Sequence, residues 1–331
     1  MKLLIALILA LAGLAAALLV TPYQGFKTET YVDIPRGTST SGIARELTEN
    51  GVIRYEWELW LTRLLKPSSK LQAGEYRFAA PASALDVFNR IARGDIYFFT
   101  FTVPEGSNIF DIAGSLEAQG VMSSEDFLKA AEDPALILDL APRAKTLEGY
   151  LFPSTYRLSH KTTGAQLSKM MTDEFRKEWA KVSAGKDADV RSTVTLASLV
   201  EKETAAADER PLVASVFRNR LAQGMLLQCD PTTIYAALLD HRYRGAIHKS
   251  DLANANPYNT YENAGLPPGP IANPGAQSLA AALDPADTPF LYFVAKPAGG
   301  GHQFSATMAQ HEKAVIAYRQ ASKHAGQRKI R

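Results

Sequence analysis

The sequence has few of the residue types that build metal sites and cross-links. Its 331 residues include one cysteine, Cys229, which excludes an intramolecular disulfide and the zinc sites that are built from cysteine pairs. The six histidines form neither an HExxH motif nor a His-x-His pair, so we expect no metal and no other cofactor. A formal net charge of only +2, without a basic stripe, predicts that nucleic acid is not a partner.

Charged residues are also absent from a long run near the N-terminus. Residues 3–20 contain no charged side chain. Eighteen apolar residues are near the lower limit for crossing the hydrocarbon of a bilayer, and they exceed the apolar part of a typical cleaved signal. We therefore interpret residues 1–22 as a single-pass transmembrane anchor, with a cleaved signal peptide as the alternative. Both interpretations place the rest of the chain outside the cytoplasm.

A repeat with an offset of 69 residues follows the apolar run. Residues 34–52 match residues 103–121 in a Pro-x-Gly turn, in apolar helix positions and in a glycine near the end. Each copy predicts a short strand, a turn, a helix that ends at glycine, and a second helix. Strand–helix–helix–strand units of this size resemble LysM modules, which bind glycan chains. A generic unit of the same shape, used as a spacer, is the alternative.

One carboxylate has an unusual position in a predicted helix over residues 190–205. With 3.6 residues per turn, Glu203 lies on the apolar stripe of Leu199 and Val200, whereas Glu201 points to nearly the opposite side. A carboxyl group at the edge of a core is desolvated, which raises its pKa. A carboxyl group that stays protonated near neutral pH suits a general acid. The alternative is a last-turn residue that simply reaches water.

Seven blocks of sequence occur in a definite order between about residue 30 and about residue 320. They are Leu147–Tyr156, Ala197–Thr204, Glu209–Leu221, Gly224–Tyr235, Pro257–Tyr261, Gly265–Gly275, and Leu291–Ala295 with Gly301–Phe304. In order and spacing, these blocks resemble the endolytic murein transglycosylases of the YceG-like (MltG) family.

The resemblance implies a peptidoglycan lytic transglycosylase. Such an enzyme cuts the β-1,4 bond between N-acetylmuramic acid and N-acetylglucosamine and leaves a 1,6-anhydromuramyl end. It also implies that Glu203 is the catalytic residue, which first protonates the leaving oxygen and then accepts the proton of the C6 hydroxyl. Two alternatives remain open. One is a non-catalytic LysM-type peptidoglycan-binding or scaffold protein, and the other is a muramidase-type hydrolase.

Several further residues are candidates for substrate binding. They are Glu148, Gln228, Asp230, Tyr258, Asn259 and Tyr261. Glu148 can equally cap or pair within the fold, and Asp230, which precedes a proline, is also an ordinary helix N-cap. Residues 253–275 are rich in proline, glycine and asparagine and predict a long loop that forms one wall of the cleft. Its tyrosines would stack on sugar rings, and Asn259 would bind a hydroxyl or acetamide group.

Together these patterns predict an α+β fold with four segments. They are a transmembrane helix over 1–22, a LysM-like βααβ module over 23–100, a larger α+β catalytic domain over 101–325, and a basic tail over 326–331. The expected partners are peptidoglycan glycan strands, the membrane and peptidoglycan synthases. The expected location is the inner (plasma) membrane, with the catalytic domain on the periplasmic side.

Overall fold

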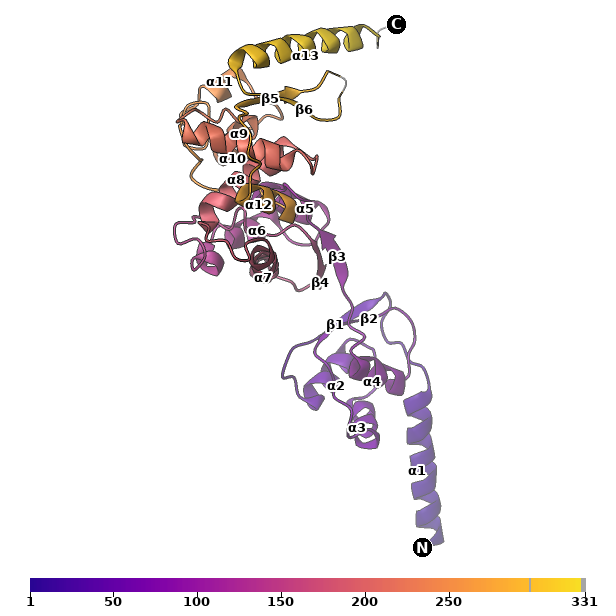
Figure 1. Ribbon diagram of the computed structural model, residues 1–331. Helices are drawn as coiled ribbons and strands as arrows, with labels where there is room; N and C mark the ends of the chain where they lie inside the picture. Colours follow the sequence, from indigo (N-terminus) through magenta and orange to yellow (C-terminus); the bar gives the residue numbers. More distant parts are fainter. Residues whose placement is uncertain (298, 329–331) are drawn as a thin grey trace. The chain divides into compact units, whose positions relative to one another are not determined.

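The computed structural model describes residues 1–297 and 299–328. The protein is a mixed α+β protein, as the sequence predicts, and the chain divides into two compact units (Figure 1). Unit 1 comprises residues 1–100 and 157–159, and unit 2 comprises residues 101–156 and those from 160 onward.

Unit 1 begins with the apolar helix that the sequence predicts. Helix α1 (Lys2–Val20) has 19 residues and a mean hydropathy of 3.0 over its most apolar window. At 1.5 Å per residue it is about 29 Å long, which matches the hydrocarbon thickness of a bilayer. Leu19 is its one buried residue, so nearly all of the helix has no protein around it. Length and composition allow α1 to cross a membrane.

The rest of unit 1 has the βααβ order that the repeat predicts. The elements are β1 (Thr30–Ile34), α2 (Thr40–Glu49), α3 (Glu56–Leu65), β2 (Gly74–Phe78) and a following helix α4 (Ala84–Arg93). Strands β1 and β2 are antiparallel, with Val32 opposite Tyr76. The buried core includes residues of both strands and of the helices, among them Val32, Leu59, Phe88 and Ile91. This order alone does not identify a LysM module.

The backbone itself repeats between the two copies. Gly37 and Gly106 have φ values of 84° and 76°, and Gly51 and Gly120 have φ values of 67° and 68°. These left-handed conformations favour glycine, which explains why glycine occurs at the same offset in both copies. The second copy comprises β3 (Phe99–Thr102), α5 (Ile109–Ala118), α6 (Ser124–Ala131), the 3₁₀ helix η1 (Pro134–Ile137) and β4 (Thr155–Leu158). Strand β3 pairs with β4.

The remaining elements of unit 2 are mostly helical. They are α7 (Gly164–Val182), α8 (Val190–Glu203), α9 (Arg210–Ala222), α10 (Asp230–Leu239), α11 (Lys249–Leu252), α12 (Ala276–Leu283), β5 (Tyr292–Ala295), β6 (His302–Ser305) and α13 (Met308–Arg328). Helix α8 packs against α9, α10 and α12, and α13 covers the β5–β6 hairpin (Figure 1). Residues 326–328 of the predicted basic tail continue α13, and residues 329–331 lie outside the described residues.

Candidate active site

Helix α8 carries the predicted catalytic residue at its last position. Asp189 caps the helix by accepting a 2.7 Å hydrogen bond from the backbone N–H of Ser192. Leu199 and Val200 are fully buried, as the apolar stripe predicts. The chain leaves the helix at Thr204, which has an extended backbone. Glu203 therefore lies where the buried stripe reaches the end of the helix.

The side chain of Glu203 is half-buried. Its burial raises its pKa, and the nearby charge of Asp230 adds to that rise. The thiol of Cys229, which donates a 3.0 Å hydrogen bond to Oε1, opposes the rise, and so does His302. The balance leaves a carboxyl group that holds its proton at a higher pH than an exposed glutamate does.

A cavity of about 310 Å³ adjoins Glu203. Its volume is within the range of small-ligand pockets. Its polar lining consists of Glu203, Arg220, Gln228, Asp230, Tyr261 and His311, and its apolar lining of Val216, Phe217, Leu227 and Phe293. The structure thus brings four of the predicted site residues together, namely Glu203, Gln228, Asp230 and Tyr261. Such a mixture of hydrogen-bonding groups and aromatic faces suits a sugar.

The segment before α10 is held in an unusual conformation at this cavity. Gln228 has a φ of 52°, which is uncommon for a residue other than glycine. Its backbone N–H donates to the carbonyl oxygen of Thr260 at 3.1 Å, and the N–H of Cys229 donates to Oγ1 of Thr260 at 3.0 Å. The hydroxyl of Tyr261 donates to Oδ1 of Asp230 at 2.5 Å. Loop residues 260 and 261 therefore fix residues 228–230 in place.

The alternative role of Asp230 as an N-cap is wrong. Cys229 occupies the N-cap position, and Asp230 is the first residue of α10, followed by proline. A proline in the first turn is compatible with a helix because the N–H groups there have no partner within the helix. The carboxylate of Asp230 is consequently available to Tyr261 and to the cavity.

Glu148 does not line this cavity. It is buried within unit 2, where Oε1 accepts a 3.0 Å hydrogen bond from Asn273 and Oε2 accepts from Tyr235 at the same distance. The backbone N–H of Ile109 donates to Oε2 as well, at 3.0 Å. Burial raises the pKa of Glu148 to about 8, although the donors from Ile109 and Tyr235 oppose the rise. Because these internal donors occupy both oxygens of Glu148, we favour a structural role for this residue.

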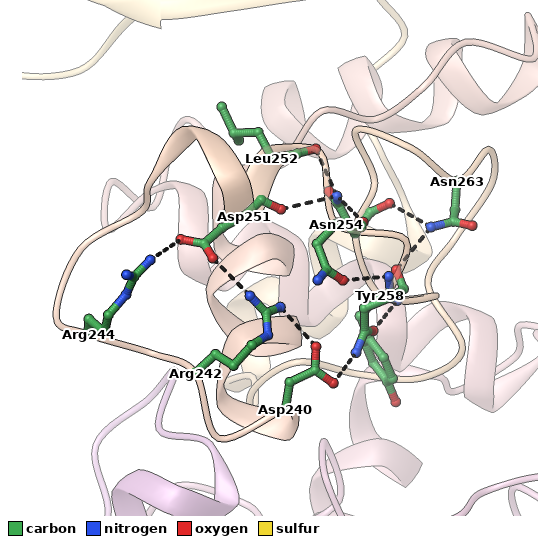
Figure 2. A network of polar contacts seen from close by, with 10 residues as sticks. Asp240, Arg242, Arg244, Asp251, Leu252, Asn254, Tyr258 and Asn263 are labelled. Atoms are coloured by element: carbon green, nitrogen blue, oxygen red, sulfur yellow. Dashed lines mark hydrogen bonds and ion pairs between the residues drawn. The ribbon is translucent and has the colours of Figure 1, made fainter.

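The asparagine-rich loop is held together by its own side chains (Figure 2). Asn259 is fully buried, and its amide nitrogen donates to the carbonyl oxygens of Leu252 and Asn254 at 2.9 and 2.7 Å. Tyr258 lines a separate small cavity with Glu148 and packs on Tyr235, with ring centroids 5.1 Å apart. Of the loop residues proposed from sequence, Tyr261 reaches the cavity beside Glu203, whereas Tyr258 and Asn259 do not.

The second half of the loop packs against the side of α8 that is opposite Glu203. The N–H of Ile271 donates to Oγ of Ser198 at 3.1 Å, and the N–H of Gly275 donates to Glu201 at 2.9 Å. Glu201 also forms a 3.2 Å ion pair with Arg210, in which both side chains are more than nine-tenths buried. The side of α8 opposite Glu203 is therefore a buried, ion-paired surface that holds the helix in the domain.

Sequence reasoning missed several groups around Glu203. The sequence pattern gives no role to Cys229, although this residue directly precedes Asp230 in the same block. Arg220 donates to the carbonyl oxygens of Leu291 and Leu227 at 2.7 and 3.0 Å. His311 comes from α13, and burial, with the charge of Arg220 added, lowers its pKa. Nothing in the polar sequence of this final helix indicates that His311 reaches the cavity.

A second acidic residue near the end of α8 binds a histidine. Glu209 accepts hydrogen bonds from the backbone N–H of His302 at 2.6 Å and lies 2.7 Å from its ring Nδ1. A side chain at residue 301 would meet Glu209, so Gly301 allows this close approach. Burial tends to raise the pKa of Glu209, but the hydrogen bonds from His302 outweigh it and lower the pKa. His302 therefore links the start of β6 to Glu209 at the N-terminus of α9.

The described part of the chain contains no group of three or more His, Cys, Asp or Glu side chains placed to hold a metal ion. A shielded carboxyl group with a raised pKa, on the wall of a polar cavity, is the arrangement expected of an acid–base enzyme.

The sequence model of the YceG-like family matches residues 32–317. The chain therefore belongs to the YceG-like family.

Named relatives agree with this assignment. The chain is 34% identical over 311 residues to an endolytic murein transglycosylase of Bacillus subtilis (strain 168), covering 88% of this chain and 85% of the relative. It is 29% identical over 315 residues to the protein of the same name from Streptococcus pneumoniae (strain D39), of which it spans 57%. A crystal structure of a yceG-like protein from Listeria monocytogenes has 31% identity and a TM-score of 0.55. The match covers 87% of this chain and 99% of that one.

Proposed function

We propose that this chain is an endolytic murein transglycosylase that acts on peptidoglycan glycan strands. Its similarity to the Bacillus protein of that name extends over 85% of the relative. The observation that carries the chemistry is Glu203, whose pKa is raised by burial on the wall of the cavity. The aromatic and amide groups around that cavity suit a pyranose ring and its N-acetyl group.

In this proposal Glu203 transfers a proton twice. The protonated carboxyl group first gives its proton to the glycosidic oxygen of the leaving N-acetylglucosamine. The resulting carboxylate then accepts the proton of the C6 hydroxyl as that oxygen closes the 1,6-anhydro ring. An ordinary glycosidase needs a second carboxylate as nucleophile or base, whereas here the substrate supplies the nucleophile. The thiol of Cys229 stabilises the carboxylate between the two steps because it donates to Oε1.

The position of Asp230 is also compatible with a second reaction, hydrolysis of the glycosidic bond. Its carboxylate lines the same cavity as Glu203, and an inverting hydrolase uses two carboxyl groups on either side of the bond. In a muramidase-type hydrolase, Asp230 would activate a water molecule. Against this role, Asp230 already accepts a 2.5 Å hydrogen bond from Tyr261. We therefore assign Asp230 to substrate positioning.

Mass spectrometry of the products tests this choice directly. Intact, purified glycan strands are incubated with the protein, and the new ends are weighed. Anhydro ends are lighter than hydrolysed ends by one water molecule, so a transglycosylase and a hydrolase give different masses. Asp230→Asn should still give anhydro ends at a reduced rate. Hydrolysed ends from the unaltered protein would refute transglycosylation, and uncut strands would favour the binding or scaffold function.

The proposal includes a place for the protein in the cell. Helix α1 would anchor it in the inner (plasma) membrane in a single pass, with the catalytic unit on the periplasmic side. The βααβ part of unit 1 would act as a LysM-like glycan-binding module. Gln228, Asp230 and Tyr261 would contact the substrate. Anchoring would keep the enzyme near newly made strands, which makes peptidoglycan synthases its proposed partners.

A further inference from the structure

Helix α3 of unit 1 presents apolar side chains on two opposite faces. One face is buried in the core of the unit through Leu59, beside the buried side chains of Glu58 and Thr62. The other face contains Trp57, Trp60 and Leu64, which are 38%, 48% and 75% exposed. Only the narrow side between these faces carries Glu56 and Arg63. A surface helix of a globular domain normally has polar residues opposite its buried face, so α3 departs from that rule.

The exposed apolar residues form one continuous stripe. Positions 57, 60 and 64 are three and four residues apart, so their side chains follow each other along one side of the helix. Leu65, which is 64% exposed, widens the stripe at its C-terminal end. Tyr55 lies at the other end and stacks on Trp57, with ring centroids 6.2 Å apart and planes within 15°. We refer to Tyr55, Trp57, Trp60, Leu64 and Leu65 as the α3 stripe.

The α3 stripe belongs to the same packed unit as the end of α1. Leu19, in the last turn of α1, is 5% exposed and lies in the buried cluster that contains Leu59 of α3. Helix α1 contacts α3 and α4, and Figure 1 shows α4 beside the end of α1. Arg54, just before α3, donates to the carbonyl oxygen of Pro22 at 3.2 Å. These contacts fix the end of α1 to the same packed unit that carries the α3 stripe on its surface.

We propose that the α3 stripe docks on the surface of the lipid bilayer where α1 emerges. This inference rests on the proposed anchoring by α1. Tryptophan and tyrosine prefer the boundary between hydrocarbon and headgroups because their rings are apolar and carry one polar group. Leu64 and Leu65 would lie among the upper acyl chains, as the apolar face of an interfacial helix does. Unit 1 would then have two membrane contacts and a fixed orientation on the bilayer.

The positions of the three tryptophans provide the test. Trp57 and Trp60 lie on the α3 stripe, whereas Trp179 is 9% exposed in unit 2. The full chain is reconstituted in phosphatidylcholine vesicles and floated on a density gradient. Its tryptophan emission is then compared between ordinary and brominated phosphatidylcholine, and with iodide added to the water. We expect brominated lipid to quench up to roughly two thirds of the emission, since two of three tryptophans face lipid.

Two substitutions make the result specific. Trp57→Phe with Trp60→Phe should abolish the quenching by brominated lipid, because only Trp179 remains. The matched control, Trp179→Phe, should keep the quenching and increase its share of the total emission. Phenylalanine keeps an apolar ring at each position, so the fold should tolerate these changes.

Each other outcome overturns the inference in a recognisable way. Protein that floats with vesicles, but whose Trp57 and Trp60 are quenched only by iodide, would have a water-exposed stripe. Protein that floats and is quenched by neither agent would have its stripe covered by another protein surface, such as a second copy. Protein that fails to float would refute the anchoring by α1 itself, and the docking of α3 with it.

Discussion

The thiol of Cys229 lies 3.0 Å from Oε1 of Glu203 and donates a hydrogen bond to it. The two residues are 26 positions apart and meet because α8 packs against α10. Burial raises the pKa of the Cys229 thiol well above its usual value, and the adjacent Glu203 adds to that rise, so the thiol keeps its proton. Glu203 thus has a permanent donor, which favours its charged form against the effect of burial.

Cys229→Ala should move the pH dependence of activity. Without the thiol donor, the pKa of Glu203 rises further, so the protonated acid persists to higher pH. The basic limb of the kcat/KM profile should move upward by up to about one pH unit, which corresponds to about 1.36 kcal/mol. The measurement is the cleavage rate of glycan strands between pH 5 and pH 10.

Cys229→Ser is the matched control for this shift, because the serine hydroxyl also donates a hydrogen bond. Its basic limb should stay close to that of the unaltered protein. A downward shift in Cys229→Ala would show that the thiol is not a net stabiliser of the carboxylate.

Glu203→Gln should abolish strand cleavage in a folded protein. The amide has almost the same shape but transfers no proton, and losing a general acid–base group costs on the order of 10²-fold or more in rate. Glu262→Gln, an exposed change in the loop beside Tyr261, is the control and should be active. Glu201 is unsuitable for this purpose because its carboxylate is buried and paired with Arg210. Near-normal activity of Glu203→Gln would refute the mechanism.

The same substitution should affect stability in a pH-dependent way. The pKa of Glu203 is raised in the folded protein, so the folded state binds this proton more tightly than the unfolded state does. Its contribution to stability is therefore present at low pH and is lost as the pH rises through the folded-state pKa. Glutamine has no such loss, so Glu203→Gln should become more stable relative to the unaltered protein between pH 5 and pH 8. Urea unfolding at both pH values measures this difference, and a difference that stays constant would contradict it.

Glu148→Gln should destabilise the fold without weakening substrate binding. Above its pKa of about 8, Glu148 is ionised and both of its oxygens accept hydrogen bonds, so an amide nitrogen in either place faces a donor. An unpaired buried donor costs about 1–3 kcal/mol. Thermal unfolding at about pH 9 should show the loss, and the loss should be smaller at about pH 6, where Glu148 itself carries a proton. KM should stay unchanged where the variant is folded. Glu125→Gln, an exposed change on α6, should leave stability within about 0.5 kcal/mol. An altered KM with full stability would restore a binding role for Glu148.

Tyr261→Ala should weaken glycan binding more than it lowers the melting temperature. Its ring lines the cavity and is only partly buried, and aromatic contacts of this kind contribute about 0.5–1.5 kcal/mol. The dissociation constant should therefore rise by up to about 10-fold. Tyr258→Ala is the contrasting variant, because that ring packs on Tyr235 away from the cavity and should mainly affect stability. If binding is unchanged in Tyr261→Ala, the tyrosine serves only to hold Asp230.

The sequence predicts those features of the site that depend on local geometry. The position of Glu203 follows from the helical period, and the left-handed glycines follow from the repeat. It does not predict which polar residues meet across the fold. Asn259 occurs in the same block as Tyr261, and Glu148 belongs to another block of the same series, yet the hydrogen-bond partners of both side chains are internal. Only tertiary packing decides this. The α3 stripe was likewise missed because apolar residues in a predicted helix are normally assigned to a core.

Gln228 combines an unfavourable backbone conformation with a side chain that lines the cavity. A residue with a side chain and a φ of 52° is held at an energetic cost on the order of 1 kcal/mol, which glycine would avoid. Gln228→Gly would remove this cost, since the backbone at this position already has a conformation that glycine adopts readily. The melting temperature of that variant would be higher, but the variant would lose the side-chain amide that lines the cavity. The conformational penalty is thus retained for as long as the protein needs a side chain at that point.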